Sequence, residues 1–98
     1  MIAEKAKFDV LKEAREQVRK GTYILREHAI ERQAERILGL PDVLRVLEYG
    51  RHESSKDIFD IKNQCWKYAI RGRTLSGFDL RVIVRFREKM AIITVIRV

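Results

Sequence analysis

The fold of this chain is decided by residues 66–86, which read WKYAIRGRTLSGFDLRVIVRF. In the second half of this stretch the even positions from Phe78 to Phe86 are all apolar, and Asp79, Arg81 and Arg85 stand among the odd positions between them. A period of two residues is typical of a β-strand that buries one face. We therefore expect the even positions to face a core and the odd positions to face away from it.

The first half of the stretch predicts a second strand. Its register is set by Trp66, Tyr68 and Ile70, because a shift by one residue would exchange its two faces. These residues join the even face only if an odd loop connects the strands, as in a loop over 74–76 followed by a bulge at Gly77. Trp66 and Tyr68 are then core residues rather than a base-stacking platform. The opposite face collects the basic side chains of the two strands: Lys67, Arg71, Arg73, Arg81 and Arg85.

The C-terminal run AIITVIRV predicts a last strand. A four-residue hairpin loop over 87–90 would pair Phe86 with Ala91 and Ile83 with Thr94. Thr94 would then lie on the basic side of the sheet, diagonal to two of its arginines. The prediction is an antiparallel sheet of at least three strands.

The N-terminal half predicts the helices. The elements expected before the sheet are a helix over residues 4–20, an edge strand over 22–25, a helix over about 27–38, a third helix that Pro41 opens and Gly50 ends, and a short strand over 57–61. We expect an α+β fold in which two or three N-terminal helices pack on one face of a C-terminal antiparallel sheet. The length is that of a single domain, 1–98, with its core over 21–98. The apolar stripe of helix 1–20 is thin, which predicts a peripheral helix or a partner-binding arm.

Charge is distributed unevenly along the chain. Residues 1–49 hold 10 Lys/Arg against 9 Asp/Glu, whereas residues 50–98 hold 11 against 5. The pI near 9.9 favours a polyanion as partner: nucleic acid, an acidic membrane surface or an acidic protein. No apolar stretch approaches the roughly 18 residues of a membrane span, and charges interrupt the N-terminus where a secretory signal would be apolar. We expect a cytoplasmic protein with no membrane partner.

Cys65 is the only cysteine, which excludes an internal disulfide and fits a reducing compartment. With His28 and His52 as the only histidines, the ligands of a structural zinc site are lacking, and no metal is expected. Glycine loops of the Walker type, serine-nucleophile motifs and paired catalytic carboxylates are also absent from the sequence.

The basic strand face is suited to phosphate, because guanidinium groups stay charged and bind two oxygens at once. The alternative is a solvated face neutralised by salt bridges. Of the five carboxylates after residue 49, only Asp79 lies in these strands, where it is expected to pair with Arg73 or Arg81, so neutralisation should be poor. We interpret the face as a phosphate-binding surface to which Arg87 and Lys56 add further contacts.

His28 is a candidate for proton transfer, since its ordinary pKa lies close to neutral and Arg32 follows one helical turn later. Together they would place a proton-transfer group beside a phosphate. The alternative is an ordinary surface histidine. His52, in a loop beside Arg51 and Glu53, carries less weight as a catalyst.

The order of motifs resembles a known family. The run YILREHAIERQAERILGLPDVLRVLEYG, followed by WKYAIRG, FDLRVIVRF and AIITVIRV, is similar to small prokaryotic proteins labelled a domain of unknown function. That family in turn resembles the RelE/ParE-like toxins. The shared pattern is a strand running into His-Ala-x-x-Arg, a second Arg near a Gly, an Asp-Val helix, a Gly, and strands ending in Thr-Val. It covers 23–98, and it departs from the family where the usual Arg-Gly reads Leu38-Gly39.

The resemblance implies a toxin of a type II toxin–antitoxin pair, an RNA endonuclease (mRNA interferase) related to the RelE and MqsR groups. Its substrate would be mRNA, free or on the ribosome, and its partner an acidic or zinc-finger antitoxin. The residues carried over by motif are His28, Arg32, Arg36, Arg81, Arg85 and Thr94.

The roles that follow are those of metal-independent cleavage, in which the 2′-hydroxyl of the RNA is the nucleophile and no cofactor is needed. Arg81 and Arg85 would stabilise the phosphate, His28 would transfer a proton, and Thr94 would position the phosphate by a hydrogen bond. Lys67, Arg71 and Arg73 would hold the RNA backbone.

Two alternatives stay open at this level. A non-catalytic toxin of the ParE branch would act by binding a topoisomerase, and its basic face would clasp an acidic antitoxin. A basic RNA- or DNA-binding module would have the same charge distribution without toxicity.

Overall fold

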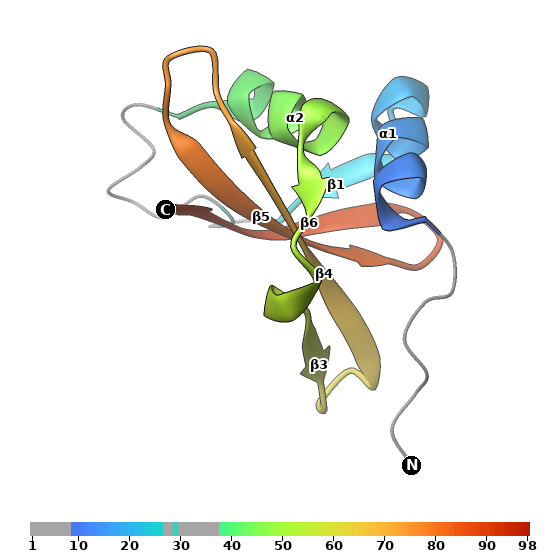
Figure 1. Ribbon diagram of the computed structural model, residues 1–98. Helices are drawn as coiled ribbons and strands as arrows, with labels where there is room; N and C mark the ends of the chain where they lie inside the picture. The colour runs from blue at the N-terminus through green and yellow to red at the C-terminus, as the bar shows by residue number, and fades with distance from the viewer. Residues whose placement is uncertain (1–8, 27–28, 30–37) are drawn as a thin grey trace.

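The computed structural model describes residues 9–26, 29 and 38–98 of the chain. Within this part, two helices pack on one face of a six-stranded, mostly antiparallel sheet, which is the expected α+β fold (Figure 1). The elements in chain order are α1 (Val10–Lys20), β1 (Tyr23–Leu25), α2 (Leu40–Tyr49), β2 (Arg51–His52), the 3₁₀-helix η1 (Ser54–Lys56), β3 (Ile58–Asp60), β4 (Cys65–Arg73), β5 (Asp79–Phe86) and β6 (Met90–Arg97).

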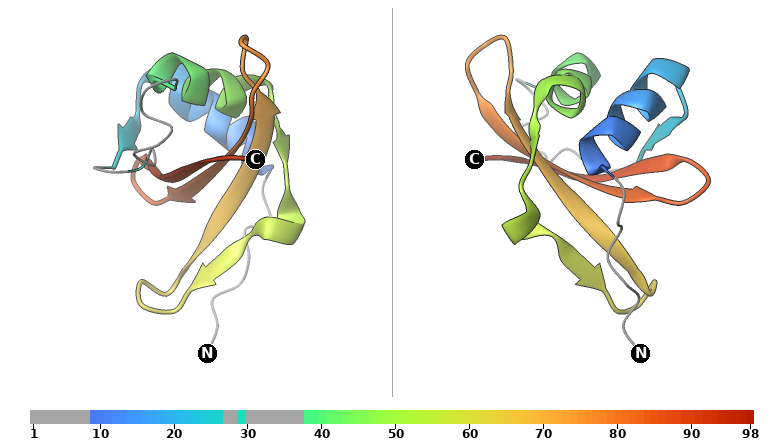
Figure 2. Two further views of the ribbon diagram at one scale, coloured as in Figure 1. Left: turned by 90° about the vertical axis from the view of Figure 1, so that its left-hand side faces the viewer. Right: turned by 45° about the vertical axis from the view of Figure 1, so that its right-hand side comes forward.

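The strands lie in the order β1-β6-β5-β4-β2, and β3 pairs with the other end of β4. Only β1 is parallel to its neighbour, β6, while the remaining pairs are antiparallel. The end of the sheet formed by β3 and β4 extends beyond the area that the two helices cover (Figure 2). Neither α1 nor α2 covers the opposite sheet face.

Both described helices have local signals at their ends. The Asp9 carboxylate caps α1 by accepting hydrogen bonds from Leu11 N at 3.0 Å and Lys12 N at 3.2 Å. At the start of α2, Gly39 N donates to Asp42 Oδ2 at 2.9 Å. The expected ends at Gly21 and Gly50 are confirmed. Residues 4–8 of the first expected helix, and the helix expected over 27–38 except Ala29 and Leu38, lie outside the described residues.

The β4–β5 hairpin joins the faces as expected, because Ile70 pairs with Val82 and Arg71 pairs with Arg81, but its loop spans 74–78 instead of 74–76 and no bulge follows it. Gly77 lies in the connecting turn with φ +89°, a conformation that glycine adopts without strain. Tyr68 is buried, at 5 % exposed, and Trp66 packs partly buried against the same core. The even face of these strands is therefore the core face.

The register of the β5–β6 hairpin differs from the expectation in one place. Ile83 pairs with Thr94 as expected, but Phe86 pairs with Met90 rather than with Ala91. The cause is a bulge in β6, where Ile93 is an extra residue between two paired positions. The loop is one residue shorter than expected and spans 87–89.

The core lies between the helices and the even face of the sheet. Its largest fully buried side chains are Leu47, Ile70, Leu80, Met90 and Ile92, with valines from α2, β5 and β6 around them. Residues 51–64 contain two short strands, β2 and β3, where only one was expected. Among the described residues, no helix is both long and apolar enough to cross a membrane.

Candidate nucleic-acid interface

The sheet face opposite the helices, here called the basic face, is organised in rows by the strand pairing. Arg51, Arg71 and Arg81 stand beside one another on β2, β4 and β5. In a second row on the same face, Ile24 of β1 lies next to Ala91 of β6, which pairs with Arg85 of β5. Between these rows lie Ala69, Ile83 and Thr94. The basic face thus has cationic groups at its two ends and a small, largely apolar centre.

One end of the basic face is a paired cluster, formed by Arg71, Arg73, Arg81, Glu53 and Asp79. Glu53 accepts hydrogen bonds from Arg81 Nε at 2.6 Å and from Arg71 Nη1 at 3.3 Å. Asp79 accepts from Arg71 Nη2 at 3.3 Å and from Arg73 Nε at 3.0 Å. The cluster thus contains three guanidinium groups and two carboxylates, and its net charge is about +1.

The expectation of poor neutralisation is wrong for this cluster. Asp79 pairs with Arg73 as expected, but also with Arg71 rather than with Arg81. The second carboxylate, Glu53, comes from the segment after β2 and lies 28 residues before Arg81. On β4, Lys67 forms an ion pair with Asp60 of β3, with 3.7 Å between Lys67 Nζ and Asp60 Oδ2. The strands themselves hold few acids, and the short β2–β3 segment supplies the missing ones.

The pKa values of the two carboxylates follow from these contacts. The hydrogen bond from Arg81, with that from Arg71, holds the pKa of Glu53 below its ordinary value despite the opposing effect of burial. Hydrogen bonds from Arg73 and Arg71 likewise lower the pKa of Asp79. Both carboxylates are therefore ionised at neutral pH and held in place by guanidinium groups.

These shifts predict an acid-sensitive part of the stability. Because the folded pKa lies below the ordinary values of 4.5 for Glu53 and 3.8 for Asp79, the stabilisation is complete above about pH 5 and is lost as pH falls through the folded values. We expect Glu53→Gln/Asp79→Asn to show a flatter fall of the free energy of unfolding below about pH 5 than the unmodified protein, measured by urea titration. Glu88→Gln, which removes an exposed carboxylate, is the control and should keep the original slope. An unchanged slope in the double variant would contradict the assignment.

Hydrogen bonds to Ala69 of β4 hold the segment that carries Glu53. Glu53 N donates to Ala69 O at 2.8 Å, and Ala69 N donates to Asp57 Oδ1 at 2.9 Å. Asp57 Oδ2 lies 2.8 Å from His52 Nε2, and the Asp57 side chain is fully buried. His52, which carries little weight as a catalyst, thus helps to hold the segment between β2 and β3 through its contact with Asp57.

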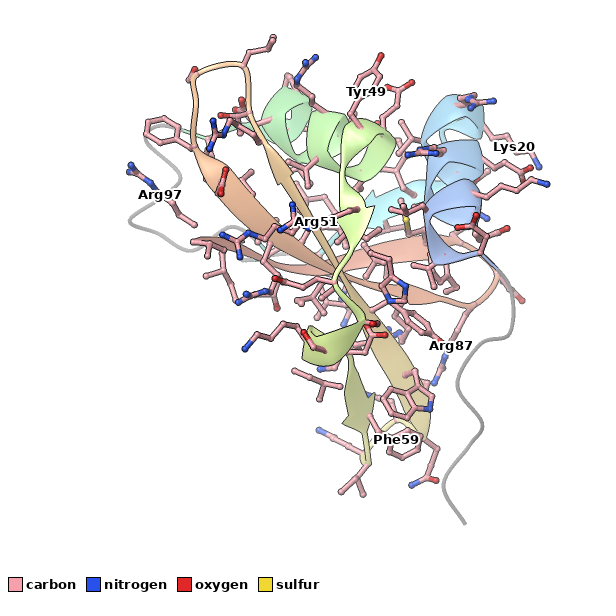
Figure 3. The ribbon with its side chains drawn as sticks, in the orientation of Figure 1. Lys20, Tyr49, Arg51, Phe59, Arg87 and Arg97 are labelled. Carbon is pink, nitrogen blue, oxygen red and sulfur yellow. The ribbon has the colours of Figure 1, made fainter. Side chains whose placement is uncertain are left out.

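The other end of the basic face is an open cluster, formed by Arg26, Arg85, Arg87 and Lys89. With Glu88, Ile24 and Ala91 they line a hollow of about 560 Å³. Arg87 Nη2 donates to Asn63 O at 2.9 Å, and Arg87 projects from the turn between β5 and β6 (Figure 3). Within the described part of the chain, no carboxylate forms an ion pair with these four cations. The open cluster has four cations to one acid.

The structure separates the predicted site residues into groups. Arg85 and Arg87 belong to the open cluster, and Thr94 lies half-buried between the clusters, opposite Ile83. Lys56 is exposed on η1. Arg71, Arg73 and Arg81 belong to the paired cluster, and Lys67 is paired with Asp60. His28, Arg32 and Arg36 lie outside the described residues.

Sequence reasoning missed four contributors to this face, of which Arg51 reaches it through the pairing of β2 with β4. Arg26 follows the expected edge strand, but only the parallel pairing of β1 with β6 brings it to the hollow. Lys89 lies in a hairpin loop, where a lysine is ordinarily just solvated. Glu53 has no sequence signal, since its partners are distant along the chain.

Comparison with known families adds an assignment to this geometry. The family model described as "Domain of unknown function (DUF4258)" matches residues 25–97. The chain belongs to this family. The DUF4258 match includes both clusters of the basic face except the strand residue Ile24, and it leaves α1 outside. No curated protein and no solved structure matches the chain. The expected resemblance to a family of unknown function is confirmed, and its toxin-like reading is taken up below as a proposal.

Proposed function

We propose that this protein is the toxin of a type II toxin–antitoxin pair and cleaves RNA without a metal ion on its basic face. The observation that carries the proposal is the open cluster, where Arg26, Arg85, Arg87 and Lys89 surround a hollow on the sheet face that α1 and α2 leave uncovered. A concentration of positive charge with one nearby carboxylate favours a polyanion. The resemblance of the sequence motifs to RelE/ParE-like toxins makes RNA the polyanion.

The shape of the hollow suits a single-stranded segment. Its apolar part, Ile24 and Ala91, offers a surface for a base or sugar, and Ile24 is 48 % exposed. The guanidinium group of each arginine around it is able to bind two oxygens of a phosphate at once. Unpaired RNA presents bases and phosphates together, as this combination requires.

The chemistry proposed here is internal transesterification. The 2′-oxygen attacks the adjacent phosphorus and gives its proton to a base, the bond to the 5′-oxygen breaks, and that oxygen takes a proton from an acid. The products are a 2′,3′-cyclic phosphate and a 5′-hydroxyl. Arg85 and Arg87 would stabilise the charge that develops on the phosphate oxygens.

The roles of the other residues follow from their surroundings. Arg81 is engaged by Glu53 at 2.6 Å, so the principal phosphate-binding role passes from Arg81 to Arg85. Thr94 lies between the clusters and would donate a hydrogen bond to the phosphate. The proton-transfer role of His28 rests on the motif resemblance. An acidic or zinc-finger antitoxin would inhibit by covering the same basic face.

The test is incubation of the purified protein with RNA in EDTA. We expect cleavage in the presence of the chelator, products ending in 2′,3′-cyclic phosphate, and growth arrest when the protein is produced in cells. Salt-sensitive RNA binding without cleavage would replace the proposal by a binding module. Toxicity without any RNA binding would replace it by a ParE-like interaction toxin.

A further inference from the structure

We propose that Arg71 and Arg81 form a second phosphate site on the basic face, which the Glu53 carboxylate occupies until RNA displaces it. The inference rests on the proposed function in one respect, that the displacing ligand is RNA. It concerns the regulation of the face rather than the reaction at the open cluster.

The contacts of Glu53 are those that a phosphodiester would make. Its two oxygens accept hydrogen bonds from two different guanidinium groups, Arg81 at 2.6 Å and Arg71 at 3.3 Å. A phosphodiester also presents two charged oxygens, and arginine pairs bind carboxylate and phosphate by the same geometry. Glu53 therefore stands where a phosphate group of RNA would bind.

The guanidinium groups have donors left over. Arg71 Nε is buried and has no hydrogen-bond partner in the described structure. Of the donors of Arg81, only Nε has a described partner. Arg51, exposed on β2 and adjacent to Arg71, has none among the described residues (Figure 3). The Glu53 carboxylate thus leaves donors of this row unpaired, and an RNA segment, which adds ester and sugar oxygens to the two non-bridging oxygens of each phosphate, offers acceptors for them.

Glu53 is able to leave without unfolding its segment. Glu53 N donates to Ala69 O, the Asp57 carboxylate accepts from Ala69 N, and Asp57 also lies 2.8 Å from His52 Nε2, so these contacts hold the segment independently of the Glu53 side chain. A change of the Glu53 side-chain rotamer is enough to open the site. The Glu53 side chain is 14 % exposed, so it lies at the surface from which RNA would approach.

The two phosphate sites lie on one strand and one face. Arg81 and Arg85 are four residues apart on β5, which corresponds to about 13 Å. One RNA strand bound at the open cluster would bring a further phosphate near Arg81 at high effective concentration. A short anion lacks this second attachment and should therefore displace Glu53 less readily than a longer RNA strand does.

The experiment measures binding of a fluorescent, single-stranded 2′-O-methyl RNA, which cannot be cleaved, by fluorescence anisotropy. We expect Glu53→Gln to bind about tenfold more tightly, because the competing carboxylate is gone. Glu53→Asp keeps the charge but is too short to reach both arginines, and it should also bind more tightly. Glu48→Gln removes one carboxylate from α2, away from the basic face, and should change affinity by less than about threefold.

The decisive comparison is the double variant Glu53→Gln/Arg81→Gln. We expect it to lose the gain, because the gain acts through Arg81. A gain that persists without Arg81, or a Glu53→Gln affinity equal to that of Glu48→Gln, would overturn the inference. Circular dichroism and urea unfolding check that each variant is folded.

Inorganic phosphate gives a readout that does not depend on RNA. The protein is titrated with phosphate, and the NMR signal of Arg81 Nε–Hε reports binding. We expect this signal to reach saturation at a lower phosphate concentration in Glu53→Gln than in the unmodified protein. Equal saturation would overturn the inference. Failure of every variant to bind RNA would overturn the proposed function instead, and the phosphate titration would still decide whether Glu53 occupies an anion site.

Discussion

Replacing Arg85 and Arg87 together by alanine is expected to lower the affinity for single-stranded RNA by at least about a hundredfold. Each arginine would contribute a charge-assisted hydrogen bond worth about 1.5 kcal/mol or more, and 1.4 kcal/mol corresponds to tenfold. Neither side chain forms an ion pair with a described carboxylate, so the loss should not be offset by release of an internal ion pair. Fluorescence anisotropy measures the affinity, and RNA cleavage in EDTA should be lost in parallel.

The salt dependence sharpens this prediction. Two lost phosphate contacts should make the slope of log affinity against log salt shallower by about 1.4 for a single strand. The matched control is Arg19→Ala/Arg45→Ala, which removes two positive charges from the helices; Arg45 lies over the Tyr49 ring in α2, at 5.0 Å from its centroid. If the control loses as much affinity as the Arg85/Arg87 variant, binding depends on net charge and not on the basic face.

Gly50→Ala is expected to destabilise the protein by about 3 kcal/mol or more, or to prevent folding. A Cβ atom at this position would lie 2.4 Å from Val46 O and 2.6 Å from Arg71 O. Both are backbone atoms, so neither is able to move aside as a flexible side chain would, and overpacking costs reach the upper end of their range. The protein would be destabilised because α2 and β4 would have to move apart. Urea unfolding measures the loss of free energy of unfolding.

Gly39→Ala is the control for this substitution. A Cβ there would meet only Pro41 Cδ at 3.5 Å, an ordinary contact, and the backbone of Gly39 is extended. We expect a loss of no more than about 1 kcal/mol, the cost of alanine at a helix N-cap. Equal losses at the two glycines would contradict the close approach of α2 to β4, which carries Arg71 to its place on the basic face.

The sequence predicted the β4–β5 hairpin because two independent patterns agree there. The period of two in β5 defines one apolar face, and Trp66, Tyr68 and Ile70 admit only the register that joins it. The bulge at Ile93 was missed because AIITVIRV contains no glycine, and because Ile93 follows another isoleucine and nothing marks it as an extra residue. β1 was expected as an edge strand, but three residues do not specify a parallel partner.

The candidate site was predictable in part for the same reason. Arg71, Arg81 and Arg85 share a face by periodicity alone, and the strand pairing confirms that placement. Their different surroundings were not predictable, because Glu53 and Arg26 reach the basic face through contacts between distant parts of the chain. Local sequence patterns thus predict which arginines share the basic face, and tertiary contacts decide which of them pair with carboxylates.

The central claim is that the open cluster binds RNA, and NMR mapping tests it most directly. Isotope-labelled protein would be titrated with a single-stranded 2′-O-methyl RNA. We predict the largest shifts at the side chains of Arg85 and Arg87 and at the amides of the 87–89 loop, with little change in α1 and α2. Shifts confined to the helices, or none on the basic face at saturating RNA, would contradict the account.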